Sequence, residues 1–361
     1  MKIHIDINHP AHVHYFRNFI KIMESKGHSF TITNRDAPII NQLLDYYKIP
    51  HYIRNKRPEK QNFLKSMYYL MRMVKHCMLH SFKNKPDLYV GFAASQCAIT
   101  SFLFRKPCIL LDDTEHNKVN HALYKPFCSV VLTPFYFKKR LGKKQIYFNA
   151  YIEQLYLHSK YYKSDLSILN ELGVCSKPYA LIRYISYDAA HDSKVMPLSE
   201  NIKKALLLKL AEKLPVFVSL ESGVNDSFYD KYKIKISPEK MHDVIANASF
   251  FLTEGTTMAV EAGILGIPYL YINPLQEVGN VIEQVTTYPQ IATKSTDVNT
   301  INTAIKNNTN NIISLEQKNK IREEIEQSTI NPTDFFVWFV ENYPESKKIM
   351  QENPDYQYNF R

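Results

Sequence analysis

Glycine is scarce in this chain of 361 residues, with nine in all. No GxGxxG or Walker pattern occurs, which excludes the standard dinucleotide-binding and ATP-binding sites that are built on glycine-rich turns. The five cysteines are scattered without a CxxC pair, and most lie in apolar segments where a thiol acts as a small core residue. This cysteine usage favours a reducing compartment and argues against structural zinc.

Long apolar runs are also absent, since no segment approaches the roughly eighteen apolar residues needed to cross a bilayer. The first residues, MKIHIDI, lack the long apolar stretch of a signal peptide. We therefore predict a cytoplasmic protein, either free or at the inner face of the cytoplasmic membrane. A 45% hydrophobic composition over 361 residues is enough to fill the cores of about two domains.

The net charge of +10 is concentrated in residues 54–85, which hold nine Lys or Arg residues against one acid, Glu59. A helix over residues 62–82 would be basic, aromatic and only partly able to bury its apolar side. Such a helix suits an anionic membrane surface or a lipid diphosphate. The alternative is a core helix with a solvated, charged face. Nucleic acid is not expected as a partner, because no zinc-finger, RNP-type or helix-turn-helix signature occurs.

Strands alternate with helices along most of the chain, which predicts parallel sheets covered on both faces. The first set has expected strands at 1–7, 28–33, 88–91, 108–111 and 129–133, with helices at 13–26, 36–47 and 93–104. After a short helix within 164–177, the second set has strands at 179–184, 216–220, 250–253 and 269–272, with helices at 199–213, 239–247, 256–265 and 277–285. We predict two doubly wound, Rossmann-like domains, 1–165 and 166–332, followed by a C-terminal helix and polar tail, 333–361.

Ligands of open α/β sheets bind beyond the carboxyl ends of the strands, and four polar segments follow predicted strands there. The first, DINHPAHVH, places three histidines within six residues at a strand-to-helix turn. Histidine there can act as a general base or contact phosphate. We select His9 and His14 as candidates for chemistry and His12 as a helix-start residue. Spacing alone does not establish a metal site.

The second segment, DDTEH at 112–116, crowds four ionisable groups at one strand end. Groups this close repel or pair, which moves carboxylate and histidine pKa values toward neutrality. Asp113, Glu115 and His116 are therefore catalytic candidates. An Asx-type helix cap with a salt-bridged neighbour is the alternative.

The third segment, RYISYDAAHD at 183–192, follows the first strand of the second domain. Arg183 can pair bidentately with phosphate oxygens, Asp188 is a further candidate for binding a nucleotide sugar, and His191 is a catalytic candidate. A polar loop without a ligand is the alternative.

The fourth segment, SFFLTEGTTMAVEAGILGIPYLYIN at 249–273, reads as strand, tight turn, helix and strand. Gly255 is expected to allow a sharp turn, Thr256 to cap the helix and Gly266 to stop it. The start of such a helix suits a phosphate group, and Glu261, one turn on, can take the hydroxyls of a ribose. An ordinary βαβ unit with a surface glutamate is equally compatible with this segment. The binding candidates are Glu254, Gly255, Thr256, Thr257, Met258 and Glu261.

Together the four segments resemble the GT-B clan of two-domain sugar-nucleotide enzymes, whose domains face a central cleft. The sequence is identified as a member of the DUF354 family over nearly its whole length. LTEGTTMAVEAGILGIP is similar to a motif of UDP-GlcNAc 2-epimerases and of the N-acetylglucosaminyltransferase that makes lipid II. The resemblance implies that Thr256 and Thr257 hold the nucleotide diphosphate and that Glu261 binds ribose.

Two departures limit the resemblance. The glycine-rich loop that the transferase relatives carry after the first strand is replaced here by His-Pro-Ala-His, so the contacts of that loop do not carry over. Asp113, Glu115 and His191 fall near the acidic residues and the histidine of the epimerases, although the surrounding motif text differs.

Our leading hypothesis is a glycosyltransferase that moves a sugar from a nucleotide donor, a UDP-sugar, to a cell-surface glycan precursor, with a lipid-linked precursor included among the acceptors. A base among His9, His14 and Glu115 deprotonates the acceptor, while the helix dipole and Arg183 stabilise the leaving diphosphate. We therefore expect no metal and no cofactor. A UDP-N-acetylhexosamine 2-epimerase or hydrolase is the first alternative, and a silent nucleotide-sugar-binding protein is the second. The many titratable groups speak against the silent protein.

Overall fold

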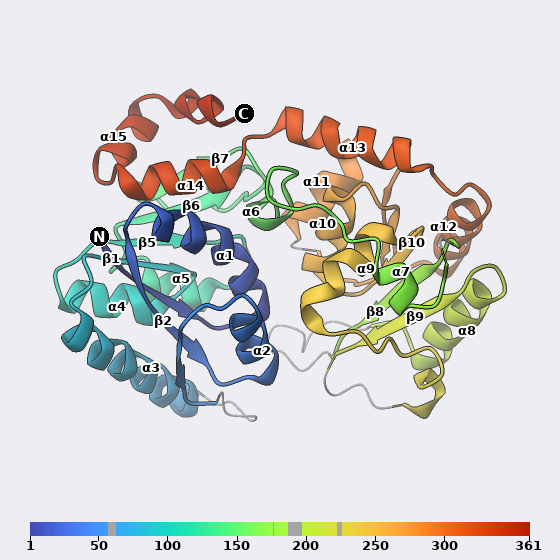
Figure 1. Ribbon diagram of the computed structural model, residues 1–361, viewed down its shortest axis with the longest axis horizontal. Coiled ribbons are helices and arrows are strands. Elements are labelled where there is room, and N and C mark those ends of the chain that lie inside the picture. Colours follow the sequence, from blue (N-terminus) through green and yellow to red (C-terminus); the bar gives the residue numbers. More distant parts are fainter. Residues whose placement is uncertain (57–62, 176, 187–196, 222–225, 277) are drawn as a thin grey trace. The chain divides into compact units, whose positions relative to one another are not determined.

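The computed structural model describes residues 1–56, 63–175, 177–186, 197–221, 226–276 and 278–361, which form two compact α/β units (Figure 1). Unit 1 combines Met1–Tyr161 with Thr329–Arg361, and unit 2 is Tyr162–Ser328. The first boundary lies four residues before the expected 165/166. The reason is local, because the Tyr162 hydroxyl and the Asp165 amide both donate to Oδ1 of Asp243 in unit 2, at 2.8 and 3.0 Å.

Unit 1 is built on a parallel sheet of seven strands in the order β3-β2-β1-β4-β5-β6-β7. The strands are β1 (Lys2–Ile7), β2 (Ser29–Arg35), β3 (Tyr52–Arg54), β4 (Leu88–Phe92), β5 (Cys108–Leu111), β6 (Val130–Pro134) and β7 (Gln145–Phe148). In β1, the alternating side chains Ile5 and Asp6 are both fully buried. Both faces of the sheet are therefore covered, as expected for parallel strands linked by helices.

Helices of unit 1 follow the predicted alternation. They are α1 (Pro10–Ser25), α2 (Pro38–Tyr46), α3 (Phe63–Asn84), α4 (Ser95–Leu103), α5 (Lys118–Tyr124), α6 (Gln154–Leu157), α14 (Pro332–Glu341) and α15 (Glu345–Glu352). Helix α1 begins three residues before the expected start, because Pro10 is suited to a first helical position and His9 caps it. Among the described residues, no helix combines the length and apolar character needed to span a membrane.

The C-terminal segment belongs to unit 1, where α14 lies beside α1 (Figure 1). The rings of Phe19 and Phe336 are 4.5 Å apart, and Asn331 caps α14 by accepting from the amides of its first turn. The expected polar tail is instead folded as α15 and a 3-10 helix, Pro354–Phe360. Trp338 stacks on Tyr356 at 4.8 Å, which ties that tail to α14.

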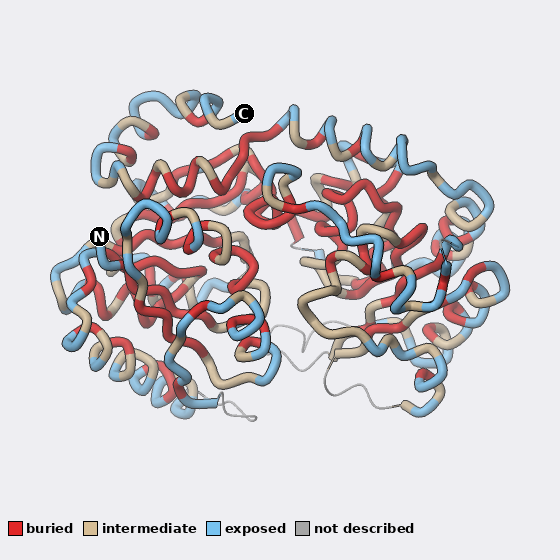
Figure 2. The backbone as a smooth tube through the Cα atoms, in the orientation of Figure 1, coloured by how far each residue is buried: buried red, intermediate tan, exposed pale blue. Residues whose placement is uncertain are grey.

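Unit 2 has a parallel sheet of five strands in the order β12-β11-β10-β8-β9. The strands are β8 (Ala180–Tyr184), β9 (Val216–Leu220), β10 (Phe250–Thr253), β11 (Tyr269–Tyr271) and β12 (Ala292–Lys294). The helices are α7 (Ile168–Glu171), α8 (Glu200–Ala211), α9 (Met241–Asn247), α10 (Thr256–Ile264), α11 (Gly279–Thr287), α12 (Val298–Asn310) and α13 (Leu315–Ser328). The central strands β8 and β10 are buried at nearly every residue (Figure 2). The two doubly wound sheets expected from the sequence are confirmed.

Candidate functional site

Helix α10 begins directly after the end of β10, at the carboxyl edge of the unit 2 sheet. Gly255 is its N-cap, and the expected turn occurs there with an extended backbone at φ −85°, without the positive φ that requires glycine. Thr256 is the first helical residue rather than the cap, and its hydroxyl bonds the Tyr271 hydroxyl at 2.9 Å. Because no side chain of the cap accepts from the first turn, its amides remain oriented for an anion.

Arg183 lies beside the start of α10, at the end of β8. Its Cγ is 3.9 Å from the position that a Cβ on Gly255 would take, and its Nη1 donates to the Ser219 hydroxyl at 2.8 Å. Burial lowers the pKa of Arg183, while the carboxylates of Glu221 and Glu261 act in the opposite direction. A guanidinium and a helix N-terminus thus occur together, which is a combination suited to a diphosphate.

Glu254 is one of the predicted ligand-binding residues, but its side chain points into the protein interior. It is fully buried, accepts from the Ile185 amide at 3.1 Å and pairs with the Lys203 ammonium at 2.9 Å. Its backbone carbonyl accepts from the Asn273 side-chain amide at 3.0 Å. Glu254 therefore connects the loops after β8, β10 and β11 through hydrogen bonds, and these bonds position Arg183 relative to α10.

Glu261 is also buried, at 5% exposure, so the surface-glutamate alternative is wrong. Its Oε1 lies 3.3 Å from Nε2 of His242, which comes from α9. Thr257 stands one helical turn before Glu261 on the same face of α10. Sequence reasoning missed His242, which belongs to no motif; its only signal is a lone histidine in an apolar helix.

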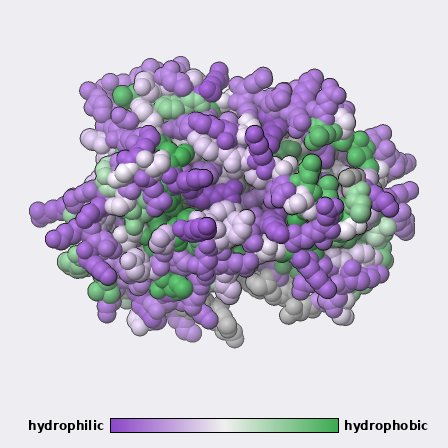
Figure 3. Space-filling model, in the orientation of Figure 1, coloured by the Kyte–Doolittle hydropathy of each residue, from purple (hydrophilic) through white to green (hydrophobic). Residues whose placement is uncertain are grey.

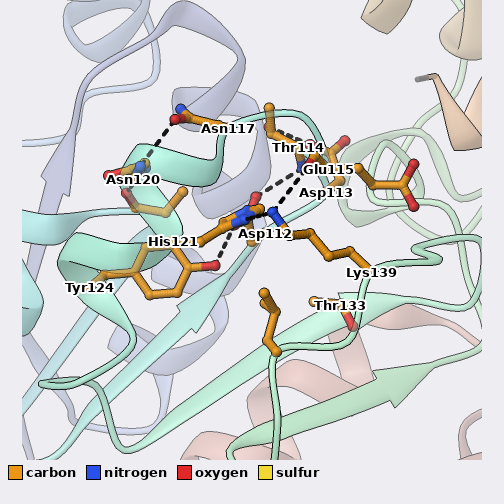
Figure 4. Close-up of polar contacts among 12 residues, drawn as sticks. Asp112, Asp113, Thr114, Glu115, Asn117, Asn120, His121, Tyr124, Thr133 and Lys139 are labelled. Carbon is orange, nitrogen blue, oxygen red and sulfur yellow. Dashed lines mark hydrogen bonds and ion pairs between the residues drawn. The ribbon is translucent and has the colours of Figure 1, made fainter. Parts of the chain in front are cut away.

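The DDTEH segment follows β5 in unit 1, and Figure 4 shows its polar contacts. Asp112 is fully buried and accepts from the Thr114 amide at 2.8 Å and from the Tyr124 hydroxyl at 2.6 Å. The first contact is an Asx turn, but Asp112 caps no helix, because the N-cap of α5 is Asn117; the expected alternative of an Asx-type helix cap is therefore met only in its Asx turn. The His121 Nε2 lies 3.2 Å from the same carboxylate.

A second missed residue, Lys139, joins this network from the loop after β6. Its ammonium is 2.8 Å from Nδ1 of His121, within a group that Figure 4 shows around Asp112. An ammonium can only donate, so Nδ1 accepts and a neutral His121 carries its proton on Nε2, facing Asp112. The neutral imidazole therefore lies between the Lys139 ammonium and the Asp112 carboxylate, and these contacts tie the DDTEH loop to α5 and to the loop after β6.

Asp113, next in the sequence, has a pKa that is shifted toward neutral pH. Its carboxylate accepts from the Thr114 hydroxyl at 3.1 Å and is partly buried. Burial, followed by the nearby Asp112 carboxylate, raises the pKa of Asp113 to about 7. A carboxylate with that pKa can take and return a proton near neutral pH. The Glu115 carboxylate accepts a hydrogen bond from the Lys138 amide. His116 is also partly buried, and its backbone carbonyl accepts a hydrogen bond from the Lys118 amide.

The histidines after β1 fall into different environments. His9 is exposed and its Nδ1 accepts from the Ala11 amide at 3.2 Å, so a neutral His9 carries its proton on Nε2. That tautomer favours donation of a hydrogen bond over removal of a proton. His14 is buried with its ring 5.4 Å from Tyr156, and burial strongly lowers the pKa of the neighbouring His12.

Two selected residues, Asp188 and His191, lie outside the described residues. Within the described ranges, no three His, Cys, Asp or Glu side chains are grouped closely enough to hold a metal ion. The structure thus brings Arg183, Glu261 and the start of α10 together in unit 2, and groups Asp113 with Glu115 in unit 1.

The two parallel α/β sheets define a two-domain protein of the GT-B type. Solved structures with this fold include the UDP-GlcNAc 2-epimerase of Methanocaldococcus jannaschii in complex with UDP-GlcNAc and UDP. That structure has a TM-score of 0.63 and 13% identity, with 91% of this chain and 100% of that chain covered. The glycosyltransferase of kitacinnamycin has a TM-score of 0.63 and 11% identity, with 94% and 98% covered.

The chain belongs to the family described as protein of unknown function DUF354, whose model matches residues 1–343. An uncharacterized protein of Methanocaldococcus jannaschii is 25% identical over 296 residues, covering 77% of this chain and 84% of the relative. The family membership expected from the four motifs is therefore confirmed.

Proposed function

We propose that the chain is a glycosyltransferase in which unit 2 binds a UDP-sugar and unit 1 supplies the acid-base group. The observation that carries the proposal is the grouping of Arg183, the α10 N-terminus and buried Glu261 at one sheet edge. In this assignment the diphosphate lies on the amides of Thr256 and Thr257, and Glu261 accepts from the ribose hydroxyls. The UDP complex of the epimerase with this fold supports the choice of nucleotide.

Asp113 is the base in this proposal, because its pKa of about 7 suits proton transfer better than the capped His9. The acceptor hydroxyl gives its proton to Asp113 and bonds to the anomeric carbon as the bond to the diphosphate oxygen breaks. Arg183 and the helix dipole stabilise the charge on the departing UDP. The acceptor is a precursor of a cell-surface glycan in its lipid-linked form.

Epimerisation at C2 of a UDP-N-acetylhexosamine is the second candidate function, favoured by the same Asp113. A carboxylate that titrates near pH 7 can remove a carbon-bound proton and return one. The fold shared with the epimerases supports this candidate too.

The donor assignment is tested by the thermal shift that UDP and UDP-GlcNAc produce in the wild type, Glu261→Ala and Arg183→Met. Glu316→Ala on α13 is the matched control, since Glu316 is exposed. We expect both nucleotides to stabilise the wild type and the control, and to lose most of that effect in the two site variants. An unchanged shift in Glu261→Ala contradicts the ribose assignment.

The reaction is tested by incubating the protein with UDP-GlcNAc, first alone and then with a lipid-linked glycan precursor. Release of UDP only when the acceptor is present supports the transferase. Formation of a C2-inverted nucleotide sugar, or of free N-acetylmannosamine, without acceptor overturns it in favour of the epimerase. In either case Asp113→Asn should abolish turnover while leaving the thermal shift with UDP intact.

A further inference from the structure

Helix α3 presents a row of large apolar side chains to solvent. Leu64, Tyr68, Met71, Leu79 and Phe82 are between 56% and 76% exposed. Their spacings are those of one face of a helix. The opposite face packs into unit 1, where Leu70, Cys77 and Ser81 are buried. This outward face therefore cannot be explained by packing within the described part of the chain.

Cations occupy the same side of the helix. Lys75 falls in the row between Met71 and Leu79, and the exposed residues Lys65, Arg72 and Lys83 flank it. No Asp or Glu occurs in α3. Arg54 makes no contribution, because it is buried and paired with Asp6 at 3.1 Å. Arg72, Lys75 and Lys83 therefore have no carboxylate within α3 to balance their charge.

The apolar row continues onto the end of α4. The ring of Phe82 lies 4.9 Å from that of Phe104, and the preceding Phe102 and Leu103 are 59% and 54% exposed. Arg105, which is exposed, follows directly. By contrast, most of the surface seen in Figure 3 is hydrophilic, with hydrophobic residues in separate patches.

We propose that this surface docks on an anionic phospholipid bilayer. We call it the α3 face, and it consists of the exposed apolar residues Leu64, Tyr68, Met71, Leu79, Phe82, Phe102 and Leu103 with the cations Lys65, Arg72, Lys75 and Lys83. Leucine, methionine and phenylalanine side chains enter the boundary between headgroups and acyl chains, while the cations stay among the anionic headgroups. The combination of both kinds of residue on one face matches an interfacial helix.

Charge separates this occupant from a second copy of the chain. Two α3 faces in contact would bring the cations of both copies together without an acid on either helix, which is unfavourable. Nucleic acid would satisfy the charge but would place phosphates against the apolar row, with no burial gained. The bilayer satisfies both features. Docking goes beyond the proposed function, because it requires no nucleotide and is measured without one.

The test is co-sedimentation of the full chain with vesicles of phosphatidylcholine alone and of an equal mixture with phosphatidylglycerol. We expect binding to the mixed vesicles only, weakened by added salt. Lys65→Gln/Arg72→Gln/Lys75→Gln should weaken that binding by about a hundredfold, because each basic residue near the anionic surface contributes separately. Leu79→Glu/Phe82→Glu should weaken it to a similar extent.

Leu315→Glu/Lys320→Gln on α13 is the matched control, because Leu315 is 71% exposed and Lys320 is also exposed. This control should bind the mixed vesicles as the wild type does, and circular dichroism should show that all variants are folded. Equal binding to both vesicle types, or unchanged binding by the α3 variants, overturns the proposal. So does a dimer in light scattering that Leu79→Glu/Phe82→Glu dissociates, or binding of single-stranded RNA in place of vesicles.

Discussion

His242 and Glu261 form a buried pair across two helices of unit 2, with 3.3 Å between Nε2 and Oε1. Each side chain is 6% exposed. The pair joins α9 to α10, and the carboxylate it holds is the one to which we assign the ribose. A histidine outside every motif is thus a direct partner of a motif residue.

Replacing His242 with alanine should lower the free energy of unfolding by about 1–3 kcal/mol, because it removes a partner of a buried carboxylate. Urea denaturation measures this change. His242→Gln retains a side-chain N–H donor and should recover part of the loss. In the proposed function His242→Ala should also weaken UDP binding, measured by titration calorimetry under conditions where the variant is folded. Equal stability of His242→Ala and the wild type would contradict the role of the pair.

Asp113 makes stability depend on pH in the direction opposite to a salt-bridged carboxylate. Burial raises its pKa from 3.8 to about 7, so the folded state holds a proton that the unfolded state releases. The contribution of protonated Asp113 to the free energy of unfolding is complete below about pH 4. It is lost as the pH rises to about 7. Asp113→Asn should remove this decline, so its advantage over the wild type should be greater at pH 8 than at pH 4. Melting curves across that range provide the measurement. A wild type and variant with parallel pH profiles would rule out the raised pKa.

Arg54, at the end of β3, and Asp6, near the end of β1, form an ion pair in which both side chains are at most 1% exposed. The guanidinium also donates to the Tyr69 hydroxyl at 2.8 Å. Arg54→Met should destabilise unit 1 by about 3–5 kcal/mol, because it leaves the Asp6 carboxylate buried without its cation. The double variant Arg54→Met/Asp6→Asn should be less destabilised than the single one. Chemical denaturation measures both, and additive losses would show that the two charges are not coupled.

Gly266 ends α10 with φ +70°, and a Cβ there would overlap the Lys318 carbonyl. Gly173 has nearly the same φ, +69°, with no atom within 4 Å of such a Cβ. Gly173→Ala should therefore cost about 1 kcal/mol from backbone conformation alone. Gly266→Ala should cost clearly more, since α13 must also move. Thermal unfolding compares the two, and equal losses would contradict the steric contribution.

The central strands were predictable because strands covered on both faces must be apolar at nearly every position. Cys108–Leu111, Val216–Leu220 and Phe250–Thr253 begin and end where their apolar runs do. The edge strands β3, β7 and β12 are not among the predicted strands. They have only three or four residues, and each includes a polar or charged one, which leaves no apolar run long enough for periodicity to detect.

The sequence predicts which loops form the candidate site. It does not predict which way the side chains in those loops point. Glu254 and Glu261 occur in one motif, and both turn out to be buried. Their partners, Lys203 and His242, come from α8 and α9, which reach them only through tertiary packing. The sequence motif located the helix start, whereas the residues that hold its glutamates carry no local signal.

Unit 2 is a continuous piece of chain, while unit 1 is split by it, because α14 returns to pack on α1. During synthesis on the ribosome, unit 2 has all its residues before unit 1 does. The hydrophobic surface of α1 that contacts Phe336 therefore stays uncovered until the last tenth of the polypeptide has been synthesised. A nascent chain released early would leave that surface uncovered and available to chaperones.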